Sequence, residues 1–282
     1  MPRSRAAQAA RTGLVSAAVS AAVTRLADGP ALDSVPGWRR TNYRGRPVSL
    51  AGGTGAVAGA LAGALLEPSG RRGAAVLAGT AAAAAGAYDD LLATRAEVAG
   101  DKGFAGHLAA IRAGRVSGGV VKVAVIGGAA LAAAGRLDGS TRSGTIRGLA
   151  DRLLRAGVIA GSANLLNLLD LRPGRAGKVA VAAGLLSASG PAGGVAAAGA
   201  GAAAGVLPSD LGERTMLGDL GANTLGALLG VRLAAGSVRT RTVALVVIGA
   251  ITAASERVSL SKVIDDTPAL RRLDLLGRAP TP

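Results

Sequence analysis

The sequence predicts an all-α fold, a polytopic membrane bundle of about nine transmembrane helices whose cytoplasmic loops form the functional site. Two features of its composition support this prediction. Hydrophobic residues make up 50% of the 282 residues and charged residues only 17%, whereas soluble domains average about a quarter charged. The apolar residues are also grouped in blocks of roughly 16 to 22 residues, the length with which a helix crosses the hydrocarbon core of a bilayer.

A soluble bundle rich in alanine is the alternative. Aromatic residues, which mark membrane interfaces, make up only 1% of the chain. A soluble bundle, however, would show polar stripes at helical spacing. Residues 48–66 and 179–207 show almost none. The membrane bundle is therefore the favoured interpretation.

The expected spans are stretches composed mostly of Ala, Gly, Val and Leu. In chain order they are residues 14–26, 48–66, 73–88, 118–135, 149–169, 179–189, 192–207, 220–235 and 243–254. The first follows Arg3, Arg5 and Arg11 and so resembles the start of a signal peptide. Because no small-x-small cleavage site follows it and more spans do, we expect it to be retained.

The distribution of Lys and Arg predicts the orientation. If the N-terminus is outside, the cytoplasmic segments are residues 27–47, 89–117, 170–178, 208–219 and the tail from 255. These segments hold most of the Lys and Arg outside the spans, so the positive-inside rule predicts a multi-pass protein of the cell membrane with a cytoplasmic C-terminus.

Two domains follow from this topology, a transmembrane domain over residues 1–257 and a cytoplasmic tail over residues 258–282. In the tail, Val263, Leu270, Leu273 and Leu276 indicate an amphipathic segment that lies against the membrane or against the helical core.

The net charge of +15 does not require a nucleic acid partner. Basic loops beside anionic lipid headgroups account for it, and no aromatic residues are interleaved with the cations for base stacking. The absence of cysteine excludes disulfides, thiolate chemistry and cysteine metal sites.

Four groups of polar residues border the spans, and ionisable residues at membrane depth are functional candidates by default. "YDD" with Asp89 and Asp90 closes the third span, and "NLLNLLD" closes the fifth. "MLGDLGANTLG" with Asp219 opens the eighth span, and "NYRGRPVSLAGG" opens the second. The predicted topology places all four groups on the cytoplasmic face.

The spacing of these residues indicates a magnesium and phosphate site. Asn164, Asn167 and Asp170 follow one another at intervals of three and therefore share a helical face, while Asp219 begins a helix after Gly218. Clustered carboxylate and amide oxygens suit Mg²⁺. The basic residues of the same loops are suited to a diphosphate: Arg44, Arg46, Lys102, Arg172, Arg175 and Lys178.

Each group also has a purely structural interpretation. Asp219 can serve as a helix N-cap, and the two asparagines can hydrogen-bond between neighbouring helices. The loop cations can act as orientation signals only. His107, the single histidine, lies in a basic loop, where a histidine is most often without a specific role.

Together the four groups resemble motifs of the polyprenyl-phosphate hexosamine-1-phosphate transferase family (glycosyltransferase family 4), which includes phospho-N-acetylmuramoyl-pentapeptide transferase. "NYRGRPVSLAGG" resembles the basic, Gly/Pro-rich start of an early span, and Asp89-Asp90 followed by Lys102-Gly103 resembles the Asp-Asp motif and its Lys-Gly loop. Asn164, Asn167, Leu168 and Asp170 match N-x-x-N-L-x-D, and residues 217–222 approximate M-G-D-x-G-S. The resemblance covers residues 40–230.

The resemblance implies a magnesium-dependent transfer at the cytoplasmic membrane face. A polyprenyl phosphate attacks the β-phosphate of a UDP-sugar and releases UMP, for cell-envelope polysaccharide or peptidoglycan synthesis. Asp89, Asp90 and Asp219 would be catalytic, with Asp90 and Asp219 on the metal. Nucleotide contacts would come from Asn164, Asn167 and Asp170, and a phosphate contact from Lys102. A homodimer remains open.

The chain also departs from the family pattern. No histidine follows His107, although the family has a His-rich motif in its last large cytoplasmic loop, and "LRPGRAGK" follows the N-x-x-N-L-x-D motif in place of Gly-Leu-Asp-Gly. Arg172, Arg175 or residues of the tail would then replace the histidines. The alternatives are a catalytically degenerate relative that binds lipid phosphate or acts as a scaffold in envelope assembly, and a small transporter, which no pair of broken helices supports.

Overall fold

The computed structural model describes residues 2–67, 70–92, 118–137 and 144–279. These residues are mostly helical, which confirms the all-α class. The helices are α1 (Pro2–Ala27), η1 (Pro30–Leu32), α2 (Ala51–Leu65), α3 (Gly70–Leu92), α5 (Gly118–Leu137), α6 (Ile146–Leu169), α7 (Arg175–Ser187), α8 (Gly193–Leu211), α9 (Gly218–Ala234), α10 (Val238–Ser255), α11 (Leu260–Asp266) and α12 (Pro268–Leu275). The strands β1 (Arg39–Thr41) and β2 (Pro47–Ser49) form an antiparallel hairpin.

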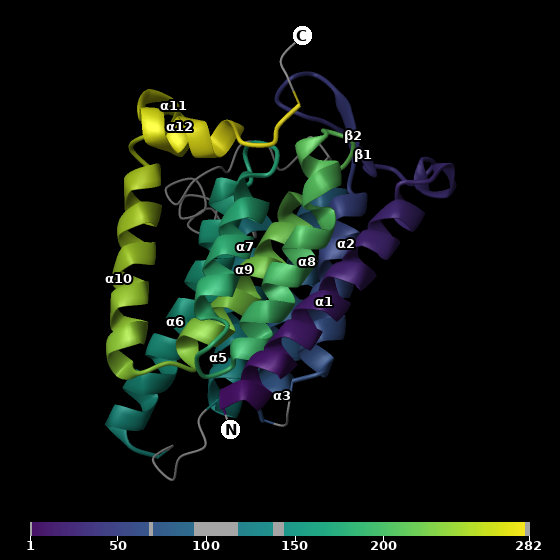
Figure 1. Ribbon diagram of the computed structural model, residues 1–282. Helices are drawn as coiled ribbons and strands as arrows, with labels where there is room; N and C mark the ends of the chain where they lie inside the picture. The colour runs from purple at the N-terminus through teal and green to yellow at the C-terminus, as the bar shows by residue number, and fades with distance from the viewer. Residues whose placement is uncertain (1, 68–69, 93–117, 138–143, 280–282) are drawn as a thin grey trace.

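Helices α2, α3 and α5 to α10 coincide, to within about five residues, with the segments expected from the sequence. Helix α1 ends as expected but begins twelve residues earlier, at Pro2 instead of residue 14. These helices lie side by side along one bundle axis, and α11 and α12 lie across one end of the bundle, next to the start of α7 (Figure 1). The β-hairpin lies at the same end. The chain therefore forms one helical bundle with an added layer at a single end.

Membrane association is suggested by two helices of the described residues, Gly119–Leu137 in α5 and Val238–Ser255 in α10, which are long and apolar enough to span a bilayer. The expectation of about nine spans is not confirmed. Helices α2 and α7 have only 15 and 13 residues. Helix α1 is long enough, but arginine, serine and threonine interrupt its apolar residues. Small and polar residues therefore make most of these helices marginal as spans.

Close packing of small residues holds α1 between α2 and α8. The buried stripe Ser16, Ser20 and Thr24 recurs every four residues on α1. It faces the glycines of α2, where a Cβ at Gly59 or Gly63 would collide with α1. The Ser20 hydroxyl donates to the Ala202 carbonyl of α8 at 2.8 Å. Small residues at interval four let helix backbones approach closely, so the polar stripe of α1 is an internal contact surface.

Helix α9 is the centre of the bundle and packs against α2, α3, α6 and α8. Leu225, Leu228 and Val231 are almost completely buried. Gly226 and Gly230 lie against the backbone of α6, because a Cβ at either position would meet backbone atoms of that helix. The close packing of α9 on α6 therefore depends on these two glycines.

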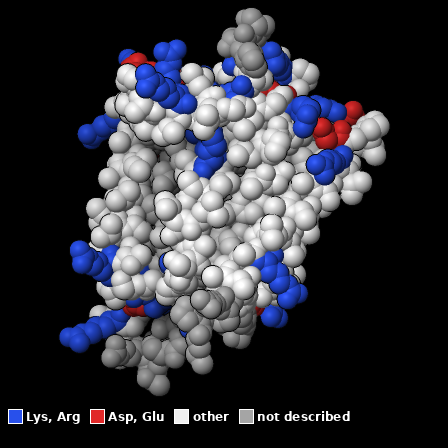
Figure 2. Space-filling model, in the orientation of Figure 1, with Lys and Arg blue, Asp and Glu red and all other residues white. Residues whose placement is uncertain are grey.

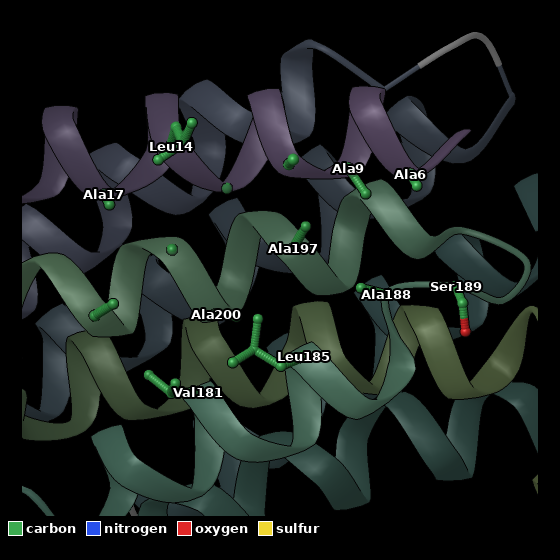
Figure 3. Close-up of a pocket in the computed structure, with 14 residues that line it drawn as sticks. Ala6, Ala9, Leu14, Ala17, Val181, Leu185, Ala188, Ser189, Ala197 and Ala200 are labelled. Carbon is green, nitrogen blue, oxygen red and sulfur yellow. The ribbon is translucent and has the colours of Figure 1, made fainter. Parts of the chain in front are cut away.

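The surface separates charged ends from an apolar middle. In the view of Figure 2, Lys and Arg side chains lie mainly at the two ends of the bundle, with a broad band of other residues between them. Within this apolar region, α1, α7 and α8 border a groove of about 610 Å³ lined by alanine, glycine, valine and leucine, with Ser189 at one end (Figure 3). The distribution of charge agrees with membrane association.

Candidate functional site

The end of α3 lies against the start of α9. The close approach requires glycine at two positions. A Cβ at Gly86 would overlap the backbone of Asp219, and Gly218 has a φ of 59°, which disfavours larger residues. This approach brings Asp89 and Asp90, at the end of α3, next to Asp219 in the first turn of α9.

A lysine from α5 connects the carboxylates of α3 and α9. The Lys122 ammonium lies 3.0 Å from Asp89 Oδ2 and also forms an ion pair with Asp219. Asn167, at the end of α6, completes the group. With its amide oriented to satisfy both neighbours, it accepts from Lys122 Nζ and donates to Asp219 Oδ1, each at 3.0 Å. We call Lys122, Asp89, Asp219 and Asn167 the lysine cluster.

Lys122 was not among the site residues predicted from the sequence. A signal for it was present, because Lys122 is the only charged residue within the expected span 118–135. A charged side chain in such a segment is costly and marks a functional candidate. Its contribution to the lysine cluster is a positive charge held between two carboxylates.

Asp90 has a different role from Asp89, because it caps α9. Its carboxylate accepts from the backbone N–H groups of Leu220 at 2.8 Å and Asp219 at 3.2 Å. The residue is 8% exposed, and Arg40 donates to its backbone carbonyl. Burial raises the pKa of Asp90 to about 6, although the Leu220 N–H opposes the shift. Both oxygens thus hold the start of α9, and Asp89 is the member of the pair that faces Lys122.

Burial also raises the pKa of Asp89, against the opposing effect of the Lys122 ammonium. The lysine cluster thus combines one cation, two carboxylates and one amide. This arrangement can bind a phosphate through the ammonium, or a cation through the oxygens.

Two further carboxylates lie beside the lysine cluster. Asp170 follows α6, and burial raises its pKa well above the usual range, with the neighbouring Asp210 carboxylate adding to the effect. Asp210, near the end of α8, accepts from the Gly174 N–H at 2.9 Å. Burial raises the pKa of Asp210 to about 7, although this hydrogen bond opposes the shift. Asp170 and Asp210 line a cavity of about 200 Å³ together with Asn42, Tyr43, Arg172 and Thr215.

The cations at the rim of this cavity are paired. Arg44 Nη1 lies 2.6 Å from Glu213 Oε1, and Arg46 Nε lies 4.0 Å from Glu213 Oε2. The Arg172 guanidinium is 4.5 Å from the centre of the Tyr43 ring and 3.5 Å from Asp265. Only Arg172 of the three lines the cavity, and each of the three arginines is paired with a carboxylate.

Arg175 is held by the tail. It makes a two-pronged contact with Asp274 of α12, Nε to Oδ1 at 2.8 Å and Nη2 to Oδ2 at 3.2 Å. Arg278 Nη2 contacts the same Asp274 at 2.6 Å, and all three side chains are at most 4% exposed. Hydrogen bonding from Arg175 holds the pKa of Asp274 below its usual range, although burial acts in the opposite direction. Arg175 is thus an internal partner of the tail.

The tail contacts the bundle through polar groups. Lys178 donates to the carbonyls of Leu273 and Asp274 at 2.8 and 2.6 Å, and Arg278 Nε donates to the Pro173 carbonyl at 2.9 Å. The residues expected to form an apolar contact face, Val263, Leu270, Leu273 and Leu276, are all exposed. The interpretation that they pack on the helical core is wrong, because buried ion pairs make that contact instead.

The remaining predicted residues are not part of the lysine cluster. Asn164 is exposed, one helical turn before Asn167. Lys102 lies outside the described residues. Of the residues proposed from the motifs, Asp89, Asp219 and Asn167 are therefore in direct contact, with Asp90 and Asp170 beside them.

Comparison with models of known protein families gives no match, and comparison with curated proteins gives no significant match. The likeness of the four motifs to the transferase family is therefore a resemblance of short motifs only.

The oxygen donors of the lysine cluster match the ligands that Mg²⁺ prefers. Asp89 Oδ2, Asp219 Oδ2 and the Asn167 amide oxygen all face one position, which Lys122 Nζ occupies. Within the described ranges, no group of three or more His, Asp or Glu side chains is placed to hold a metal ion. Mg²⁺ commonly uses one or two carboxylates and completes its shell with water and phosphate oxygens. Asp89 and Asp219 are therefore of the right chemical type for such an ion, which would have to take the position that the Lys122 ammonium holds.

The pKa of Asp210 predicts a pH-dependent stability. A carboxyl whose pKa is about 7 in the folded protein, against 3.8 normally, binds more protons when folded. The unfolding free energy therefore falls as pH rises towards 7, by up to about 1.4 kcal/mol per pH unit. Replacement of Asp210 by Asn removes this pH-dependent contribution to the unfolding free energy. We expect wild type to gain stability over Asp210→Asn as pH is lowered from 8 to 5.

Thermal unfolding of both proteins across this pH range measures the effect. The control is Asp33→Asn, because Asp33 is an exposed carboxylate that pairs with Arg39. The stability of this variant should change with pH as that of wild type does. Parallel curves for wild type and Asp210→Asn would show that Asp210 does not titrate in this range.

Proposed function

We propose that the protein is a membrane phosphoglycosyltransferase that moves a sugar 1-phosphate from a UDP-sugar to a polyprenyl phosphate. The observation that carries the proposal is the lysine cluster. In it, Asp89, Asn167 and Asp219, which come from three of the four motifs, all contact Lys122. A lipid phosphate oxygen bonds to the β-phosphorus of the donor, the bond from that phosphorus to the bridging oxygen breaks, and UMP leaves. Such transfers depend on positioning and charge neutralisation more than on covalent chemistry by the protein.

Lys122 is suited to hold a phosphate group next to Asp89 and Asp219. The Lys122 ammonium would neutralise the negative charge of the phosphoryl oxygens, and the two carboxylates fix the position of the ammonium. The adjacent cavity lined by Tyr43, Asp170 and Arg172 is suited to the nucleoside part of the donor, because it combines an aromatic ring with hydrogen-bonding groups.

Mg²⁺ bound through Asp89 and Asp219 would neutralise the charge of the donor diphosphate. Asp90 would act indirectly, by keeping the N-terminus of α9 in place. The rest of the chemistry falls to the protein itself, since Lys122 neutralises phosphate charge and Asn167 fixes the Asp219 carboxylate.

The proposed location is the cell membrane, with a multi-pass topology and the lysine cluster at the cytoplasmic end. The apolar helices α5 and α10 and the band of uncharged surface in Figure 2 support association with a membrane. A homodimer is compatible with this location.

The direct test is release of UMP by the purified full-length protein. We expect UMP when polyprenyl phosphate, Mg²⁺ and the correct member of a panel of UDP-sugars are all present, and none when the lipid or Mg²⁺ is omitted. Failure of every donor to yield UMP above the level without protein would exclude the transferase.

A second candidate function is a polyprenyl-phosphate binder that has lost transfer. The position of Lys122 between the two carboxylates favours it, since an ammonium ion there can replace the metal. This binder would retain polyprenyl phosphate in native mass spectrometry with or without Mg²⁺, and would lose it in Lys122→Met, while releasing no UMP.

A further inference from the structure

A second charged cavity lies at the opposite end of the bundle. It has a volume of about 480 Å³ and is bordered by the first turns of α6 and α10. Its charged lining consists of Arg147, Asp151, Arg155 and Arg241. Asp151 and Asn167 are separated on α6 by about 24 Å, at 1.5 Å per residue. The cavity is therefore distinct from the lysine cluster.

Two of its arginines are held in fixed positions by Asp151. Arg155 Nε lies 2.8 Å from Asp151 Oδ2, and Arg241 Nη2 lies 2.8 Å from Asp151 Oδ1. The side chains of Arg155 and Arg241 are 14% and 5% exposed. Arg155 Nη1 also donates to the Ala234 carbonyl at the end of α9. The guanidinium groups are consequently ordered before any ligand arrives.

The cavity carries an excess of positive charge. Among the lining residues that the structure describes, Asp151 is the only carboxylate, against the three arginines. Among the described residues, no carboxylate forms an ion pair with Arg147, and no hydrogen bond uses Arg155 Nη2. The N-termini of α6 and α10, capped by Thr145 and Ser237, also face this end. An anion is the ligand that such surroundings stabilise.

The surface around the cavity also includes exposed apolar side chains. Ile146, Leu149 and Val238 are 88%, 55% and 59% exposed, and Val243 on the next turn of α10 is 56% exposed. A ligand that joins a phosphate group to hydrocarbon chains would contact both the arginines and these side chains.

We infer that this cavity binds a phosphate group, either the headgroup of an anionic lipid or free inorganic phosphate. Arginine suits this ligand because its planar donors pair with two oxygens at once. The inference does not depend on the proposed transfer reaction, since it concerns the other end of the molecule.

The test uses the purified full-length protein and two probes, phosphatidylglycerol and inorganic phosphate, with phosphatidylcholine as the zwitterionic reference. Native mass spectrometry measures lipid binding, and thermal unfolding measures stabilisation by either probe. Arg147→Gln removes one cavity arginine at the exposed rim. Arg152→Gln is the matched control, because Arg152 is an exposed arginine on the same helix outside the cavity lining.

We expect phosphatidylglycerol to bind more tightly than phosphatidylcholine, and Arg147→Gln to weaken its binding about tenfold, the effect of one charge-assisted hydrogen bond. Arg152→Gln should bind as wild type does. Stabilisation by inorganic phosphate alone, lost in Arg147→Gln, would identify free phosphate as the ligand and support the cavity equally. Equal behaviour of the two variants toward both probes, or no binding of either probe, would overturn the inference.

Discussion

Replacing Asp219 by asparagine is expected to lower UMP release by about a thousandfold. Asp219 pairs with Lys122 and accepts from Asn167, so it fixes the position of the only cation in the lysine cluster. It is also one of the two carboxylates that fit Mg²⁺. The amide keeps the size of the side chain but removes the charge that both interactions need. Initial rates of UMP formation at saturating donor and lipid measure the effect.

The control for this prediction is Asp266→Asn, an exposed carboxylate of α11. It should retain the wild-type rate. Because the Asp219 side chain is 30% exposed, Asp219→Asn is expected to unfold within a few degrees of wild type, which separates lost activity from lost folding. A fully active Asp219→Asn protein would contradict the role assigned to the lysine cluster, whatever the donor.

Replacing Asp274 by asparagine should have the largest effect on stability. The variant leaves Arg175 and Arg278 buried without their common carboxylate. Removing one partner of a buried ion pair costs about 3–5 kcal/mol, because the remaining charge stays desolvated. Chemical denaturation of the detergent-solubilised protein measures the loss. Since the depressed pKa of Asp274 stabilises the fold only while it is ionised, this contribution is lost in wild type as pH falls through that pKa.

Asp265→Asn is the matched control for Asp274→Asn. Asp265 also pairs with an arginine, Arg172 at 3.5 Å, but its side chain is 45% exposed. An exposed pair contributes about 0–1 kcal/mol, so this variant should be nearly as stable as wild type. Equal losses in the two variants would show that burial does not strengthen the Asp274 contacts.

The sequence predicted the helices well because their signal is local. Long blocks of Ala, Gly, Val and Leu interrupted by loops indicate α2, α3, α5 to α10 and the second half of α1 without knowledge of their neighbours. The number of transmembrane spans was harder to predict from the same residues, because Ala and Gly are only weakly hydrophobic. The stripe Ser16, Ser20 and Thr24 has the spacing of a helix face, but its burial depends on glycines of another helix.

The site was predictable only in part, because motif residues show what is present and not what they contact. Asp89, Asn167 and Asp219 are in contact as their motifs suggested. Arg175 looked equally suitable for a diphosphate, yet its partner is Asp274, 99 residues later in the chain. Lys122 was missed because it has no polar neighbours in sequence, although its charge in an apolar helix was the available signal.

The buried ion pair between Arg175 and Asp274 can form only late in synthesis, after the tail has been translated. Ribosomes add about 5–20 residues per second, so roughly 5–20 s separate the translation of these two residues. During that interval the loop before α7, which borders the cavity with Asp170 and Asp210, lacks the contacts that the tail makes with it. The cavity next to the lysine cluster is therefore completed among the final steps of biogenesis, after every long helix has been made.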